Sequence, residues 1–112
     1  MIKIEIQRQK NKIIYFEIKG HAEFSEYGED VICAAVSSVG QMTVNGLIET
    51  LKLKKKLKFI EKDGHIVCDL KNSGLTDDEL ENADILVESM YSYLKDVAKS
   101  YKNFVKLREI KK

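Results

Sequence analysis

The sequence predicts an α+β fold in a single domain, residues 1–112, with the order β-β-α-β-β-α-β, a mostly antiparallel sheet and two helices. Three observations predict it: alternating apolar residues in the first 19 positions, a hairpin turn at residues 63–64, and two segments with helical periodicity. Hairpins separated by single helices allow both helices to pack on one face of the sheet. The chain has the usual length for one core, and no linker suggests a second domain.

Alternating apolar and polar residues near the start of the chain predict two half-buried strands. The first strand has isoleucine at every second position from Ile2 to Ile6. The second has its inward residues at every second position from Ile14 to Ile18, with Ile13 outward. We expect Arg8 to Lys12 to form the turn between the two strands.

A helical period of apolar residues runs from about Val31 to Leu51, and we expect this first helix to be largely buried. Its interior glycines, Gly40 and Gly46, each cost about 1 kcal/mol relative to alanine and therefore require a reason. One stripe of the helix consists of Cys33, Ser37, Gly40 and Val44. Small residues on this stripe let a second surface approach closely, either the sheet, which we favour, or the same helix of a partner subunit.

A second hairpin follows the first helix. Residues 57–62 and 66–70 flank Asp63-Gly64, a pair that favours a two-residue turn with positive φ at both central positions. Cys68 falls on the apolar face of the second of these strands, so we expect it to be buried packing. His65 directly follows the turn, and we expect it to be solvated.

The last third of the chain predicts a helix and a final strand. Thr76 and Glu79 fit a capping box, and apolar residues follow at steps of three and four. Residues 104–110 are the expected fifth strand, with Lys106 and Arg108 pointing outward.

The candidate catalytic residues are His21 and Cys33, which flank one loop. The thiolate is the reactive form of cysteine, and its pKa of about 8.5 must be lowered for use near neutrality. Cys33 opens the apolar helix, whose N-terminus favours an anion, and an imidazole can accept the thiol proton. The amides of Cys33 and Ala34 are candidates for an oxyanion hole. The structural alternative is that Cys33 is a small core residue and His21 a solvated loop residue.

Three short segments carry a family resemblance: Gly20-His21-Ala22, Gly28-Glu29-Asp30 and Cys33-Ala34-Ala35-Val36-Ser37. They closely resemble the bacterial ribosomal-processing cysteine protease (Prp) family, and the resemblance covers the whole chain. It implies a small homodimeric enzyme that removes a short N-terminal extension from a large-subunit ribosomal protein. It also implies that Cys33 is the nucleophile and His21 the general base, with Gly20 as a hinge-like glycine before the histidine.

Two further residues match the family motif in supporting positions, and a structural alternative stands beside each. Asp30 either orients His21 or caps the helix, because aspartate is a preferred N-cap residue. The hydroxyl of Ser37 either touches the site or bonds back to a carbonyl of its own helix.

The loop that follows His21 is the candidate substrate-binding segment. Its candidate residues are Gly20, Ala22, Phe24, Tyr27 and Gly28. Two aromatic rings on a short connection suit an extended apolar peptide, and we expect the loop to close over one. Alternatively, both rings pack inward and anchor the loop.

We expect neither a cofactor nor a metal. No close Cys–Cys or His–His spacing would nucleate a zinc site. Cys33 and Cys68 are expected to be free thiols, since a cytoplasmic chain stays reduced. No apolar run approaches the roughly 18 residues of a membrane span, and residues 1–5 are unlike a signal peptide. We therefore expect a cytoplasmic protein without a membrane partner.

The sequence also bears on two kinds of macromolecular partner, RNA and a second copy of the chain. Five lysines in residues 52–58 suggest an alternative function, a non-catalytic ribosome-associated RNA-binding module. Lysines at a helix C-terminus also complement its dipole, and the net charge is only +1, so we do not expect nucleic-acid binding. For the expected homodimer, the candidate surface contains Tyr91, Tyr93 and Tyr101.

Overall fold

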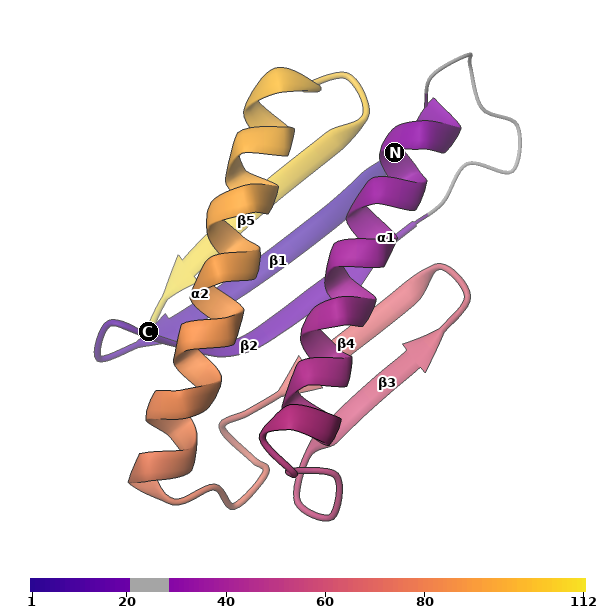
Figure 1. Cartoon of the computed structure of the whole chain (residues 1–112). Coiled ribbons are helices and arrows are strands. Elements are labelled where there is room, and N and C mark those ends of the chain that lie inside the picture. Colours follow the sequence, from indigo (N-terminus) through magenta and orange to yellow (C-terminus); the bar gives the residue numbers. More distant parts are fainter. Residues whose placement is uncertain (21–28) are drawn as a thin grey trace.

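In the computed structural model, the described residues form a five-stranded sheet with two helices side by side on one face (Figure 1). The structure describes residues 1–20 and 29–112, with only the backbone of residues 29 and 30. The strands are β1 (Ile2–Gln9), β2 (Lys12–Lys19), β3 (Lys58–Lys62), β4 (His65–Asp69) and β5 (Val105–Lys111). The helices are α1 (Glu29–Asn45), its short π-helical continuation η1 (Gly46–Thr50), and α2 (Asp77–Ser100). The sequence predicts this element order correctly.

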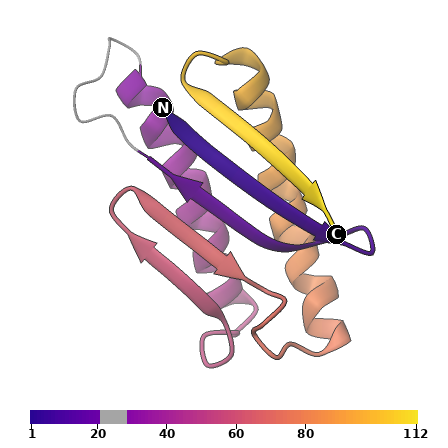
Figure 2. The same cartoon turned by 180° about the vertical axis from the view of Figure 1, so that it is seen from behind.

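The sheet is mostly antiparallel, as predicted, with the strand order β3-β4-β2-β1-β5. The pairs β1–β2, β2–β4 and β3–β4 are antiparallel, whereas β1 and β5 are parallel. A parallel pair requires a crossover connection, and the segment that contains α2 returns the chain to the edge beside β1. Figure 2 shows the opposite face of the sheet, on which neither helix lies.

Both hairpin turns differ from their predicted form. The first turn consists of Lys10 and Asn11 alone, rather than residues 8–12, and both residues have positive φ, 52° and 67°. This backbone conformation matches the right-handed twist of the flanking strands. In the second turn Gly64 has a φ of 73°, but Asp63 does not have positive φ. Glycine adopts this conformation without the steric cost that a Cβ imposes.

The helix-facing side of the sheet forms the core, and one residue predicted to point outward belongs to it. Ile13 is buried, as is the neighbouring Ile14. The pairing register shifts between Gln7 and Arg8, where β2 carries one residue more than β1. Such a bulge breaks the strict alternation of faces, so two adjacent isoleucines are buried.

Helix α1 lies close to the sheet at Gly40. A Cβ at this position would stand 2.7 Å from Cδ1 of Ile18 and 3.0 Å from Cδ1 of Ile66. A Cβ at Gly46 would stand 3.0 Å from Cδ1 of Leu86, on α2. The sheet, rather than a partner subunit, is therefore the surface that Gly40 accommodates, and Gly46 accommodates α2.

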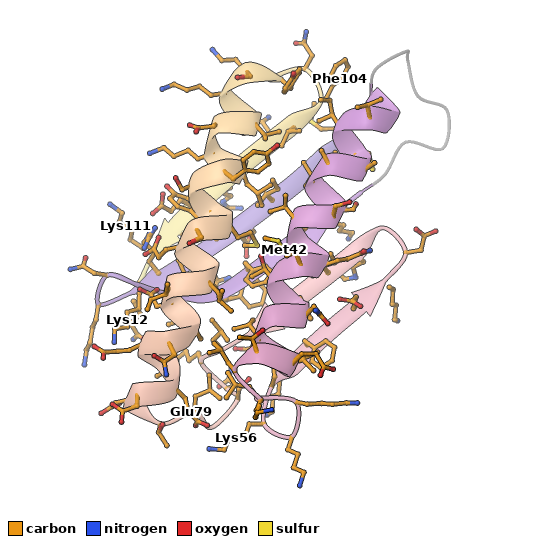
Figure 3. The ribbon with its side chains drawn as sticks, viewed as in Figure 1. Lys12, Met42, Lys56, Glu79, Phe104 and Lys111 are labelled. Atoms are coloured by element: carbon orange, nitrogen blue, oxygen red, sulfur yellow. The ribbon has the colours of Figure 1, made fainter. Side chains whose placement is uncertain are left out.

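The opposite side of α1 is exposed, so the prediction of a largely buried helix is wrong. Val36 is buried, whereas Val31 and Met42 are 69% and 66% exposed. Met42 lies on the outer side of the helix (Figure 3). Contrary to the expectation from sequence, Val31–Thr50 is long and apolar enough to cross a membrane by length and composition alone. The core helix of a globular protein passes the same test, and α1 contributes Val36 to the core.

Helix α2 begins with the predicted capping box. The amide of Glu79 donates to Oγ1 of Thr76 over 3.1 Å, and the amide of Thr76 donates to Oε1 of Glu79 over 2.9 Å. Lys56 also donates to Oε1 of Glu79 over 2.7 Å (Figure 3), and this hydrogen bond is the main cause of the lowered pKa of Glu79. Lys56 therefore has an anionic partner within the fold.

A charged cluster joins β1, β5 and α2. Arg8 binds both carboxylate oxygens of Glu88 over 2.6 and 2.7 Å, and its Nε donates to Glu109 over 2.6 Å. The bonds to Glu88 are the main cause of the raised pKa of Arg8. The Tyr91 hydroxyl donates to Glu109 over 2.7 Å, and this bond is the main cause of the lowered pKa of Glu109. Tyr91 thus links α2 to β5 within one chain, so its hydroxyl is not free to bind a second subunit.

Candidate active site

The thiol of Cys33 lies at the end of β2. Its Sγ is 4.0 Å from the carbonyl oxygen of Gly20, which belongs to the peptide bond that leads into His21. The side chain is half-buried, so it is neither enclosed in the core nor fully solvated. The structure therefore brings the cysteine to the chain segment from which the histidine follows.

Several predicted site residues lie outside the described part of the chain. They are His21, Ala22, Phe24, Tyr27 and Gly28. The side chain of Asp30 is likewise not described. The expected His–Cys contact and the substrate loop accordingly stay predictions.

Gly20 occupies a position that favours glycine strongly. Its φ is +106°, and a Cβ would stand 2.5 Å from the carbonyl oxygen of Met1. Its amide donates to the carbonyl of Gly64, in the β3–β4 turn, over 3.0 Å. Contacts with the start of the chain and with the second hairpin therefore fix the point at which the chain leaves the sheet towards His21.

The start of α1 differs from the expectation for Cys33 and Asp30. The helix begins at Glu29, so Asp30 lies in its first turn rather than at its N-cap, and Cys33 is its fifth residue. In a regular α-helix the amides of the fifth and sixth residues donate to carbonyls four residues earlier. The amides of Cys33 and Ala34 are thus already used in the helix, which conflicts with their predicted role in an oxyanion hole.

Ser37 follows Cys33 by one turn of α1 and is half-buried. Within residues 1–20 and 29–112 its hydroxyl forms no hydrogen bond, so the predicted bond back to a helix carbonyl is not seen. Thr43, further along the helix, does bond back, to the carbonyl of Val39 over 2.9 Å. Toward the described residues, the hydroxyl of Ser37 therefore stays unpaired, one turn from Cys33.

The second cysteine is a packing residue, as predicted. Cys68 is 0% exposed, and burial raises the pKa of its thiol to about 12. Cys33 and Cys68 are both free thiols. In the described ranges, no group of three His, Cys, Asp or Glu side chains is arranged to hold a metal ion.

The prediction that His65 is simply solvated is wrong. Its Nε2 lies 2.5 Å from Oε2 of Glu17, on the neighbouring strand β2. The β2–β4 register places His65 directly opposite Lys19, with Glu17 two residues along the same strand. Sequence reasoning missed this contact because a helix and the strand β3 separate the two strands along the chain.

The chain is similar to known proteins over nearly its whole length. The family model for cysteine protease Prp matches residues 1–106. The ribosomal processing cysteine protease Prp of Bacillus subtilis is 33% identical over 104 residues, which cover 92% of each chain. The Staphylococcus aureus protein of the same name is 25% identical over 108 residues, which cover 96% of this chain and 97% of the relative.

Solved structures are similar over nearly the whole chain. A Streptococcus mutans protein has a TM-score of 0.79 at 30% identity, with 100% of this chain and 96% of the other covered. The S. aureus protease Prp in complex with a substrate peptide has a TM-score of 0.77 at 24% identity, with 97% and 99% covered. The same protease with a covalently linked product peptide has a TM-score of 0.73 at 26% identity, again with 97% and 99% covered.

The two thiols are expected to differ in their reaction with iodoacetamide at about pH 8, because only a thiolate reacts readily. Native protein should gain one carbamidomethyl group, on Cys33, since burial raises the pKa of Cys68 to about 12. Peptide mass spectrometry locates the label. Denatured protein should gain two groups, and equal labelling of both cysteines in the native state would contradict the assignment.

Gly20→Ala is expected to lower the free energy of unfolding by about 3 kcal/mol, because alanine would adopt a strained φ and its Cβ would clash with backbone. Gly74→Ala is the matched control: Gly74 also has positive φ, +68°, but no atom lies within 4 Å of a Cβ there. The control should lose only about 1 kcal/mol. Urea unfolding measures both, and equal losses would show that the contact with Met1 does not constrain Gly20.

Proposed function

Because this chain belongs to the cysteine protease Prp family, we propose that it removes the N-terminal extension of a large-subunit ribosomal protein. Two relatives are named ribosomal processing cysteine proteases, and one solved relative holds a covalently linked product peptide. The observation that carries the proposal is the position of the Cys33 thiol, 4.0 Å from the carbonyl that leads into His21. Nucleophile and base can meet there without any change in the sheet.

In the proposed mechanism His21 accepts the thiol proton of Cys33. The thiolate attacks the scissile carbonyl carbon, the C–N bond breaks, and the imidazolium returns the proton to the leaving amine. Water, activated by the same imidazole, then hydrolyses the thioester and restores the thiol. The peptide, the two side chains and water supply every atom of this sequence, so we expect no cofactor.

The oxyanion donors are assigned to the first turn of α1 rather than to Cys33 and Ala34. The first N–H groups of a helix have no partner within it. A helical side chain leans towards the N-terminus, so the thiol of Cys33 leans towards the first turn, in which the amides of residues 29–31 have no partner within the helix. These amides carry the positive end of the helix dipole, which also stabilises the thiolate. Asp30 and Ser37 then act as supporting residues on either side of Cys33.

The substrate loop and the location of the enzyme complete the proposal. The loop residues Ala22, Phe24, Tyr27 and Gly28 close over an extended apolar peptide, and Gly20 fixes where this loop begins. The enzyme acts in the cytoplasm, where thiols stay reduced, in keeping with its free cysteines. Family membership argues against the alternative of a non-catalytic RNA-binding module.

Cleavage is tested with a peptide that copies the N-terminal extension, analysed by mass spectrometry after incubation with reduced protein. Wild-type protein should make one cut, and Cys33→Ala should lower the rate by about a thousandfold or more because it removes the nucleophile. Cys68→Ala is the matched control and should cut at the wild-type rate. A cut by Cys33→Ala, or none by folded wild-type protein, would overturn the proposal.

We also propose that the enzyme is a homodimer that pairs through the outer side of α1. The exposed residues from Val31 to Asn45 on this helix are uncharged: Val31, Ala34, Ser38, Gln41, Met42 and Asn45. A surface without charges is suited to burial against a second copy. Tyr93 and Tyr101, on α2 and at its C-terminal end, are also exposed and form a separate candidate surface.

Light scattering after size exclusion tests the dimer. Met42→Glu should give a monomer, because it places a charge in the uncharged surface. Ile85→Glu is the control, since Ile85 is as exposed as Met42, at 67% against 66%, but lies on α2. It should leave the dimer intact. A dimer that survives Met42→Glu but is lost with Tyr93→Glu would move the interface to the tyrosines.

A further inference from the structure

Figure 2 shows the face of the sheet that neither helix covers, and strand pairing places a row of basic residues across this face. Each strand contributes one member, and the pairing register places neighbouring members directly opposite each other. In spatial order from β3 to β5, the members of this basic row are Lys62, His65, Lys19, Lys3 and Lys106. With strands about 4.8 Å apart, the row is about 19 Å long.

The lysines of the basic row point into solvent. Ile2 and Ile4 face the core, so Lys3 between them faces the other side, and its directly paired neighbours share that side. All four lysines are exposed, and none forms an ion pair within the described residues. His65 is the exception in the row, because it contacts Glu17.

The middle of the basic row borders a hollow in the surface, about 500 Å³ in volume. Its charged lining residues are Lys3, Lys19, Lys106, Arg108, Glu5 and Glu17. The two glutamates belong to the next row of the sheet, in which Glu5 pairs with Glu17 and with Arg108. A bound polyanion is therefore attracted to the basic row and repelled by the glutamates beside it. These charges confine the polyanion to the end of the sheet at which β1 begins and β2 ends.

Like charges directly opposite each other on a sheet destabilise it. Lys3 has a lysine on both sides, Lys19 on β2 and Lys106 on β5, although the whole chain has a net charge of only +1. The basic row is thus a local concentration of charge rather than a result of composition. An anionic ligand along the row would relieve the repulsion.

We propose that the basic row binds the phosphate backbone of RNA and so docks the protease on ribosomal RNA beside its substrate. The inference rests on the proposed function, because a ribosomal protein is a substrate that RNA accompanies. A line of lysines, three of them on adjacent strands, fits a line of phosphates, and the row has no aromatic side chain on which a base would stack. Binding is therefore independent of base sequence. Lys19 directly precedes Gly20, so bound RNA lies next to the candidate active site.

This surface differs from the lysine-rich segment 52–58 that the sequence brings to notice. Lys56 in that segment is already held by Glu79. The basic row cannot be identified from the sequence, because its members come from five separate strands and meet only through strand pairing. The expectation of no nucleic-acid binding rested on the helix-dipole role of the contiguous lysines and on the low net charge, and neither of these reflects strand pairing.

The test is fluorescence anisotropy with a labelled single-stranded RNA of about 20 nucleotides, at several salt concentrations. Lys3→Gln/Lys106→Gln removes two charges from the basic row, and Lys54→Gln/Lys55→Gln removes two from the segment 52–58. Each neutralised phosphate contributes about 0.7 to the salt slope, or about fivefold in affinity at about 0.1 M salt. The first variant should therefore bind about 25-fold more weakly, with a slope smaller by about 1.4, whereas the control should bind like wild type.

Further measurements separate this inference from the proposed function. Lys3→Gln/Lys106→Gln should cut the isolated peptide at the wild-type rate and should melt no lower than wild type, since it relieves repulsion. Equal weakening of RNA binding by both double variants would overturn the assignment to the basic row. Tighter binding to polyglutamate or to anionic phosphatidylglycerol vesicles than to RNA would overturn the choice of RNA. RNA binding without peptide cleavage would instead overturn only the proposed protease substrate.

Discussion

The contact between Gly40 and the sheet is the constraint on which the candidate site depends. Cys33 precedes Gly40 by two turns of α1, so the distance of the helix from the sheet at Gly40 also sets the height of the thiol above the end of β2. The side chains of Ile18 and Ile66 occupy the space that a larger residue would need. The helix lies low enough for the Cys33 thiol to reach the carbonyl of Gly20. Glycine at position 40 lowers the stability of the helix, but it allows the reactive thiol to come this close to the sheet.

The remainder of the fold fixes the position of the Gly20 carbonyl, which the Cys33 thiol approaches. The chain leaves β2 at Gly20, between the carbonyl of Met1 and the β3–β4 turn. The position of β1 depends in turn on its parallel pairing with β5, and Arg8 links both strands to α2 through Glu88 and Glu109. Segments from the beginning, the middle and the end of the chain therefore combine to place one peptide bond beside one thiol.

The sequence predicts those parts of this arrangement that depend on neighbouring residues. Alternation identifies the strands, and the capping box of Thr76 and Glu79 locates the start of α2. Non-local effects account for the errors: a bulge buries Ile13, and cross-strand pairing brings His65 to Glu17. For the site, the spacing of residues suggested a nucleophile, whereas its specific chemistry came from the resemblance. The wrong helix start shows that a candidate residue can be identified without its local backbone being known.

The hydrogen bond between Gly20 and Gly64 has a consequence for engineering the protein. A hairpin at the edge of a sheet is ordinarily a safe place to insert a peptide or a label, because few contacts depend on it. Here the carbonyl of Gly64 receives the amide of the residue that leads into the candidate site. An insertion into the β3–β4 turn would therefore disturb the enzyme at a distance from any catalytic group.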